Sequence, residues 1–207
     1  MHPSTHYFGL TGGIACGKST VAAMLKELGA KIIDADNFGH ELLLASSPVF
    51  QEVISAFGPN ILDGRGEIDR RKLGSLVFAH PDKLRRLNAI VHPRIIERIE
   101  QAAEDYRRAD PDAVVVTDAA LIYESGIGER FMKVVAVWCR PEQQLERLIA
   151  KTGLSREEAQ KRIASQLPAE EKRRRADFVI DSSGNTEETR RQVEDLYPKL
   201  AQLSRQK

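Results

Sequence analysis

Residues 12–19 read Gly12-Gly13-Ile14-Ala15-Cys16-Gly17-Lys18-Ser19 and match the pattern G-x-x-x-x-G-K-[ST] at every fixed position. Gly12 and Gly17 allow backbone angles and close approaches that a β-carbon would block. The N–H groups of such a loop point inward and, with the N-terminus of the following helix, form a nest for phosphate oxygens. Lys18 adds a positive charge for the β- and γ-phosphates of a nucleotide, and the Ser19 hydroxyl can coordinate Mg²⁺. The stretch predicts a nucleotide-phosphate site.

The residues on either side of this loop fit a strand before it and a helix after it. The short apolar run 7–11 is closed by Gly12-Gly13, and beyond Lys18 the apolar residues fall on one helical face until Gly29. Lys31–Asp34 then reads as a second strand, so the two strands are expected to be parallel in a βαβ unit. This context supports phosphate binding over the alternative of a glycine-rich turn that binds nothing.

Three more β-rich runs follow, at 114–118, 134–138 and 178–181. They are continuous apolar runs rather than alternating ones, which is typical of parallel strands that are buried on both faces. The chain is therefore predicted to be an α/β protein.

Helical spacing accounts for most of the remaining chain. The longest such stretch runs from Pro81 to about Arg108, and Pro93 within it predicts two helices rather than one. Further helices are predicted at 143–151, 156–166 and 187–203. The interval from Asp34 to Asp118 is too long for a simple crossover, so it is predicted to hold a helical insertion.

Composition excludes several classes without naming a function. The 207 residues are 42% hydrophobic and 29% charged, which is ordinary for a folded domain, and the net charge of +1 gives no overall attraction to nucleic acid or to an anionic membrane. Cys16 and Cys139 are too few for a disulfide scaffold and are expected to be free thiols. Residues 1–6 show no secretory signal and no apolar run is long enough to cross a bilayer, so a cytoplasmic location is expected.

Missing motifs narrow the class of phosphate-loop protein. The sequence has no N-K-x-D motif for reading guanine and no L-S-G-G-Q signature of transporters. Residues 181–184 fit D-x-x-G, but they lie on the last predicted strand, where a switch that senses the γ-phosphate would be misplaced. A small chain with a helical insertion favours a phosphotransferase that acts on a small molecule.

Two carboxylates follow the second strand in Asp34-Ala35-Asp36. Ligands of open α/β sheets bind beyond the carboxyl ends of the strands, so these groups are expected to face the phosphate loop. A phosphotransferase needs a carboxylate to orient the acceptor hydroxyl and accept its proton. Alternation along an extended segment would put Asp34 and Asp36 on the same side, so spacing does not choose between them. The alternative is that one or both cap a helix beginning near Asn37.

At this point the sequence resembles the dephospho-CoA kinase family. The resemblance runs from about Phe8 to Tyr197 in the order of the family. It rests on the stretches Gly9–Thr20, Ile33–Asp36, His92-Pro93, Asp118–Glu124, Gln144–Arg147, Arg162–Gln166 and Ala176–Asp181.

The resemblance implies transfer of the γ-phosphate of ATP to the ribose 3′-hydroxyl of dephospho-CoA, which gives CoA and ADP in the final step of coenzyme A biosynthesis. It implies a P-loop kinase core with a five-stranded parallel sheet flanked by helices, a helical CoA-binding insertion and a mobile lid. The core would comprise about 6–36, 112–140 and 176–205, the acceptor domain about 37–111 and the lid about 141–175. The expected partner is the small-molecule substrate, with no nucleic acid or membrane partner, and the chain is expected to be a monomer or weak homo-oligomer.

The resemblance also assigns roles to individual residues. Asp36 becomes the catalytic base, and Lys18 and Arg147 act on the transferring phosphoryl group. Ser19 and Asp118 are the candidate Mg²⁺ contacts, although Asp118 is equally well explained as a strand-end cap. The expected ATP-binding residues are Gly13, Ala15, Cys16, Gly17, Lys18, Ser19, Thr20 and Arg162.

Some positions depart from the family pattern. The family usually has Gly at Ala15, Pro at Ala120 and Arg at Lys151, so the phosphate loop must tolerate a methyl group and the lid loses a forked guanidinium. The lid segment is rich in positive charge, and its run Lys172–Arg175 is expected to be a solvated helical face because glutamates are interleaved with it.

Two alternatives to this activity remain at the level of sequence. One is a different small-molecule or nucleotide kinase on the same core, which would differ in its acceptor pocket. The other is a catalytically silent nucleotide-binding switch, which would keep the phosphate loop but would have no use for Asp36.

Overall fold

The computed structural model describes residues 6–78 and 80–206. Most of the N-terminal stretch judged for a secretory signal, Met1–Thr5, lies outside the described residues. The chain divides into two compact units, one of Met1–Asp34 with Ala102–Lys207 and one of Ala35–Gln101.

The first unit is built on a five-stranded parallel sheet in the order β2-β3-β1-β4-β5. This confirms the predicted α/β class. The strands lie within a residue of the predicted runs because each is a short segment with buried apolar residues, and every strand after the first is rich in Val, Ile or Thr. They are β1 (Phe8–Gly12), β2 (Lys31–Asp34), β3 (Val115–Asp118), β4 (Val134–Trp138) and β5 (Phe178–Asp181).

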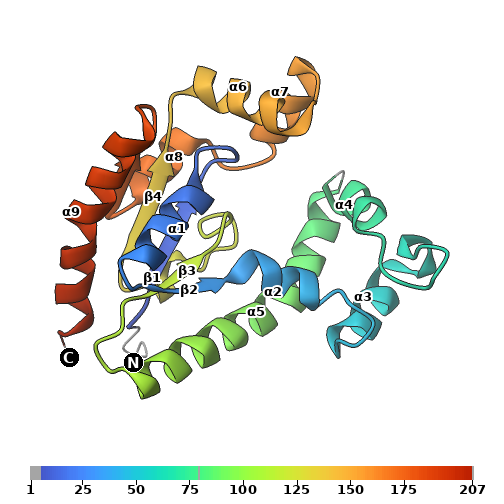
Figure 1. Ribbon diagram of the computed structural model, residues 1–207. Helices are drawn as coiled ribbons and strands as arrows, with labels where there is room; N and C mark the ends of the chain where they lie inside the picture. The colour runs from blue at the N-terminus through green and yellow to red at the C-terminus, as the bar shows by residue number, and fades with distance from the viewer. Residues whose placement is uncertain (1–5, 79, 207) are drawn as a thin grey trace. The chain divides into compact units, whose positions relative to one another are not determined.

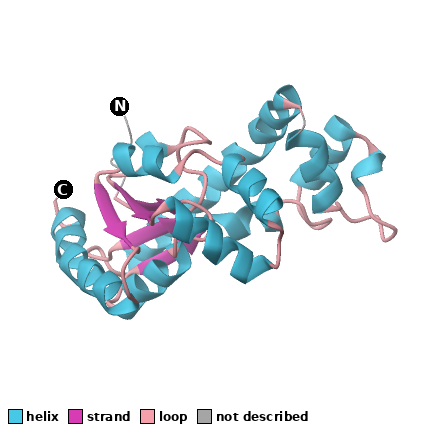
Figure 2. Cartoon of the chain, turned by 90° about the horizontal axis from the view of Figure 1, so that it is seen from above, coloured by secondary structure: helices cyan, strands magenta, loops and turns pink. Residues whose placement is uncertain are grey.

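Helices lie on both sides of the strands (Figure 2). On one face, α1 (Lys18–Glu27) and α9 (Thr186–Ser204) pack side by side over the sheet (Figure 1). Their apolar stripes bury a common core with β1, β3, β4 and β5, whose fully buried members include Phe8, Leu10, Val21, Leu25, Val135, Val193 and Leu200. On the opposite face, α8 (Ala169–Arg175) packs against β1 and β4.

Two more helices of this unit precede α8. They are α6 (Pro141–Thr152) and α7 (Arg156–Ala164), which pack on one another through Leu145, Leu148 and Ala159. The short 3-10 turn η2 (Gly128–Arg130) lies between β3 and β4.

The parallel register gathers the carboxyl ends of the strands at one edge of the sheet. Asp34 pairs with Asp118 across β2 and β3, and Gly12 pairs with Val137 across β1 and β4. The phosphate loop therefore leaves β1 at the edge where the acidic ends of β2 and β3 also lie.

The second unit is helical, as the insertion was predicted to be. It contains α2 (Ala35–Glu41), α3 (Val49–Phe57), η1 (Pro59–Ile61), α4 (Arg70–Phe78) and the part of α5 (Pro81–Ala109) up to Gln101. Its own core includes Leu42, Val49, Val53, Ile61, Leu73, Val77 and Val91. The Glu41 carboxylate accepts a hydrogen bond of 2.7 Å from Arg98 Nη1, which ties α2 to α5.

The prediction that Pro93 divides the long helical stretch was wrong. A single helix, α5, runs through it, with Pro93 inside. An internal proline costs about 3 kcal/mol because it removes a hydrogen bond and crowds the preceding turn. Apolar residues on both sides of it, Leu84, Leu87, Ile90 and Ile95, pack on the core of the helical unit, and their burial outweighs that cost.

Candidate active site

The phosphate loop joins β1 to α1 and has the backbone that its glycines predict. Gly17 has φ +85°, in the left-handed region, and immediately precedes α1. A β-carbon at Gly12 would lie 2.7 Å from the carbonyl oxygen of Val137, so only glycine fits between the neighbouring strands there. The N-terminus of α1 has no acidic residue in its first turn, which leaves its partial positive charge for an anion.

A cavity of about 430 Å³ opens over this loop. Several of the predicted site residues line it together, and Arg147 and Lys151 approach it from α6. Three cationic side chains thus face one cavity in a chain whose net charge is only +1. The lining residues are Gly12, Gly13, Ile14, Ala15, Gly17, Lys18, Ser19, Thr20, Ala120, Arg147, Lys151 and Gln166.

Lys18, which lines this cavity, forms a salt bridge with Asp118 at the end of β3. Lys18 Nζ donates to Asp118 Oδ1, and both side chains are mostly buried. The loop lysine and the acidic end of β3 are therefore held together. The sequence predicted Asp118 as a metal contact or a strand-end cap, and did not predict this pairing with Lys18. A nucleotide phosphate entering the cavity would compete with Asp118 for Lys18.

Arg147 is held in place by the turn that follows β5. Its Nη2 donates to the carbonyl oxygen of Ser182 at 2.9 Å. The Ser182 hydroxyl in turn donates to the carbonyl oxygen of Cys16 at 2.7 Å. This chain of contacts fixes the guanidinium relative to the phosphate loop before any substrate binds.

Cys16 is in the phosphate loop but does not line the cavity. Its side chain is fully buried, and its sulfur lies 3.1 Å from the sulfur of Cys139, within hydrogen-bond distance. That hydrogen bond, together with burial, raises the pKa of Cys16, so the thiol is protonated and inert rather than activated by the helix end. Both cysteines are free, as predicted.

Ala15 adopts φ 61°, the left-handed conformation that glycine prefers. Its methyl group is half-buried against the packing contact between α6 and α7. The position therefore tolerates alanine, as the departure from the family pattern required, but with a strained backbone.

Asp36 and Arg162 are not among the residues that line the cavity. Arg162 is exposed on α7. Asp36 belongs to the helical unit, in the first turn of α2, which begins at Ala35 directly after β2. The expectation that Asp34 and Asp36 alternate along one extended segment was wrong, because the helix starts between them. An acidic residue in the first turn of a helix is stabilised by the helix dipole.

Gln166 is a site residue that sequence reasoning missed. Its Oε1 accepts a hydrogen bond from the backbone N–H of Ile14 at 3.2 Å, and the Ile14 carbonyl accepts another from Gln144 Nε2 at 3.0 Å. The two glutamines hold the tip of the phosphate loop. No spacing signal connects Gln166 with a residue so distant in sequence.

Lys172 corrects a prediction about the basic run at the end of the lid segment. Its side chain has an exposed fraction of 0%, whereas a solvated face was expected for Lys172–Arg175. Lys172 Nζ contacts Glu124 Oε1 at 2.8 Å, and it donates to the carbonyl oxygen of Ala120 at 2.6 Å. Arg174 does follow the expectation, with 72% of its side chain exposed.

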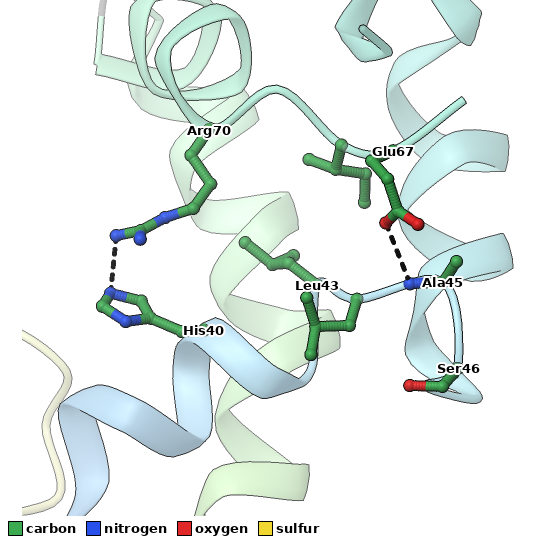
Figure 3. A pocket seen from close by; sticks show the side chains of 8 residues that line it. His40, Leu43, Ala45, Ser46, Glu67 and Arg70 are labelled. Carbon is green, nitrogen blue, oxygen red and sulfur yellow. Dashed lines mark hydrogen bonds between the residues drawn. The ribbon is translucent and has the colours of Figure 1, made fainter. Parts of the chain in front are cut away.

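The helical unit contains a cavity of its own, of about 540 Å³ (Figure 3). Its wall is largely apolar, and polar groups lie at two places on it. On one side Arg70 Nη2 lies within hydrogen-bond distance of His40 Nε2, and on the other the Glu67 carboxylate accepts a hydrogen bond from Ala45 N–H. The cavity is lined by His40, Leu43, Leu44, Ala45, Ser46, Glu67, Ile68 and Arg70.

A phosphate loop between a central parallel strand and a helix, with a basic cavity over it, defines a P-loop kinase. A model of the dephospho-CoA kinase family matches residues 6–188. The chain belongs to the dephospho-CoA kinase family, which catalyses the final step of coenzyme A biosynthesis.

Individual relatives agree with this family. The dephospho-CoA kinase of Symbiobacterium thermophilum is 50% identical over 91% of this chain and 79% of its own length, and that of Geobacillus kaustophilus is 44% identical over 89% and 92%. Among solved structures, TT1252 from Thermus thermophilus is similar with a TM-score of 0.79 and 34% identity, over 97% of this chain and 99% of its own. The dephospho-CoA kinase from Campylobacter jejuni has a TM-score of 0.69 and 29% identity, over 95% and 98%.

Proposed function

We propose that this chain transfers the γ-phosphate of ATP to the ribose 3′-hydroxyl of dephospho-CoA, giving CoA and ADP. The observation that carries the proposal is the cavity over the phosphate loop, into which Lys18, Arg147 and Lys151 bring positive charge in a chain of this family. A transferring phosphoryl group has its charge spread over three oxygens, and fixed cations around it are the main source of catalysis.

The residues that surround this cavity fit ATP and Mg²⁺. The left-handed Gly17 opens the loop toward the N-terminus of α1, where backbone N–H groups can bind the β-phosphate. The Ser19 hydroxyl at the start of α1 and the Asp118 carboxylate at the end of β3 are oxygen donors of the kind Mg²⁺ prefers. When bound, Mg²⁺ neutralises charge on the β- and γ-phosphates.

Asp36 is proposed as the group that orients the acceptor hydroxyl and accepts its proton. Its support is the family pattern at Ile33–Asp36 and its place in the chain directly after β2, whose carboxyl end lies at the same sheet edge as the phosphate loop. Arg147, fixed by Ser182, would stabilise the transferring phosphoryl group, and exposed Arg162 on α7 would reach ATP only if the proposed lid, residues 141–175, moves.

The helical unit is proposed to hold the acceptor, and its cavity supports this. An apolar wall with a guanidinium at one side suits an elongated molecule that carries both an uncharged arm and phosphate groups (Figure 3). Dephospho-CoA has this character, with a pantetheine arm and a diphosphate. Arg70 and His40 are then proposed acceptor contacts.

Location and assembly are proposed from the sequence. Free thiols suit the reducing cytoplasm, and the near-neutral net charge suits a monomer or weak homo-oligomer that acts on a small molecule rather than on nucleic acid or a membrane. Within the described residues, no helix has the length and apolar character needed to span a membrane.

A coupled ADP-release assay with competing acceptors tests the proposal. Dephospho-CoA, adenosine and nucleoside monophosphates are compared in the presence of MgATP, and turnover with dephospho-CoA is expected to exceed every other acceptor. A preference for another acceptor would point to a different small-molecule kinase. If none of the acceptors gave turnover above the blank, the chain would be a nucleotide-binding protein without kinase activity on these acceptors.

A further inference from the structure

Lys172 is the only lysine or arginine of the described chain that is fully buried. A buried charge is costly unless it is paired and hydrogen-bonded, and a hydrophobic side chain of similar volume would usually serve stability as well or better. The contacts of Lys172 indicate what the charge is for.

Both partners of Lys172 lie on the segment that follows β3. Nζ donates to the Ala120 carbonyl oxygen at 2.6 Å and contacts Glu124 Oε1 at 2.8 Å. The same Ala120 oxygen accepts a hydrogen bond from the Thr11 hydroxyl at 3.0 Å. Ala120 lines the phosphate cavity and stands two residues after Asp118, the partner of Lys18. Lys172, which does not itself line the cavity, thus holds a residue of its wall in place.

Glu124 extends this network to the residues between α7 and α8. Its Oε1 also accepts a hydrogen bond from the backbone N–H of Leu167 at 2.9 Å. Leu167 follows Gln166, which holds Ile14 at the tip of the phosphate loop. The Lys172–Glu124 pair therefore joins three segments around the cavity, namely the phosphate loop, the turn after β3 and the Gln166–Leu167 stretch.

We propose that Lys172 is a positioning residue for phosphoryl transfer, which acts through Glu124 and the Ala120 carbonyl to hold the cavity wall and Gln166 in register with the phosphate loop. The inference rests on the proposed function only for its turnover readout, since the placement of the ATP site is measured separately. Lys172 itself does not line the cavity and is not a catalytic residue.

The single tryptophan supplies a signal for this placement. Arg173, the next residue on α8, lies with its guanidinium carbon 4.4 Å from the centre of the Trp138 ring. A cation stacked on the ring makes the fluorescence of Trp138 sensitive to a shift of α8. Calorimetry measures the binding of MgATP itself, without any acceptor, and Trp138 fluorescence shows whether α8 has shifted in a variant.

The experiment compares Lys172→Met, Glu124→Gln and the double variant with the wild type. Glu124→Gln leaves the buried Lys172 without its carboxylate and is expected to lower the melting temperature more than Lys172→Met, which leaves the partly exposed Glu124 without its cation. The double variant removes both charges, so its melting temperature is expected to recover. Its affinity for MgATP, measured by calorimetry, is nevertheless expected to fall about tenfold, and kcat/KM for ATP with it, because the Ala120 carbonyl has lost the charged donor that Lys172 supplies.

Arg174→Met is the matched control, since it removes an exposed charge from the same helix. Its MgATP affinity and kcat/KM are expected to stay within twofold of the wild type, and its melting temperature is expected to be unchanged. A double variant that binds MgATP and turns over like the wild type would overturn the proposal and make the pair purely structural. A wild type that binds MgATP but does not phosphorylate dephospho-CoA would defeat the proposed function, while the binding comparison would still test the role of Lys172.

Discussion

Replacing Ala15 by glycine tests the strained conformation in the phosphate loop. Ala15 has φ 61°. This left-handed conformation costs a residue with a β-carbon about 1–2 kcal/mol of conformational energy, a cost that glycine does not have. In the opposite direction, glycine makes the unfolded chain more flexible, which lowers the free energy of unfolding by about 0.4–1 kcal/mol. The loss of a half-buried methyl group costs roughly another 0.4 kcal/mol, half the value for a fully buried CH₂. Ala15→Gly is therefore expected to leave the free energy of unfolding within about 0.5 kcal/mol of the wild type.

Ala23→Gly is the matched control. Ala23 is exposed in the middle of α1, only a short distance along the chain, and has an ordinary helical backbone. Glycine in an exposed helix interior costs about 1 kcal/mol relative to alanine. The two identical chemical changes should therefore differ in their effect on unfolding by about 1 kcal/mol.

Urea unfolding followed by circular dichroism measures both variants, with equal slopes as the test that the unfolded states are comparable. ATP affinity of Ala15→Gly should be unchanged or slightly higher, because the loop no longer has to hold a strained residue. If Ala15→Gly destabilised the protein as much as Ala23→Gly, Ala15 would not have the left-handed backbone on which the reasoning rests.

Two further predictions concern the site, and a third concerns stability at alkaline pH. Lys18→Ala should weaken ATP binding and lower turnover together, measured by calorimetry and ADP release; unchanged affinity and rate would contradict the phosphate-loop assignment. Asp36→Asn should lower turnover by about 10²-fold or more while ATP still binds, and near-wild-type turnover would move the base to Asp34 or elsewhere. Burial, and secondarily the charge of Asp177, raises the pKa of Tyr123 to about 12. Because the folded protein holds this proton more tightly than the unfolded chain, stability should fall as pH rises from about 10 to 12, and Tyr123→Phe should flatten that part of the urea-midpoint profile.

The sheet could be predicted from the sequence because its signals are local. Each strand is a short apolar run between glycine or charged residues, and buried parallel strands have few alternative explanations. The phosphate loop was predicted for a similar reason, since its backbone geometry depends on residue types at fixed spacing within a single turn. Local patterns gave these features without any knowledge of what packs on them.

The errors lie where tertiary packing or a single helix boundary decides. Pro93 carries a strong local preference to end a helix, but the preference is worth less than the apolar stripe on either side of it, which packs on the helical core. For Asp34 and Asp36 the mistake was a boundary, because extending β2 by two residues would have put both carboxylates on one side of a strand. Periodicity fixes such boundaries poorly, and here the boundary decides which unit Asp36 belongs to.

Lys172 shows why charge patterning alone does not separate a surface from a site. Within Lys172–Arg175 the residues have the same charge and the same neighbouring glutamates, yet the Lys172 side chain is fully buried and that of Arg174 is 72% exposed. Helical geometry turns successive residues by about 100°, so one position in such a run can face the sheet while its neighbours face water. The buried one is paired with two acceptors that the turn after β3 brings to it, Glu124 and the Ala120 carbonyl. Those acceptors are distant in sequence, so the burial of Lys172 follows only from the fold, and its neighbours give no warning of it.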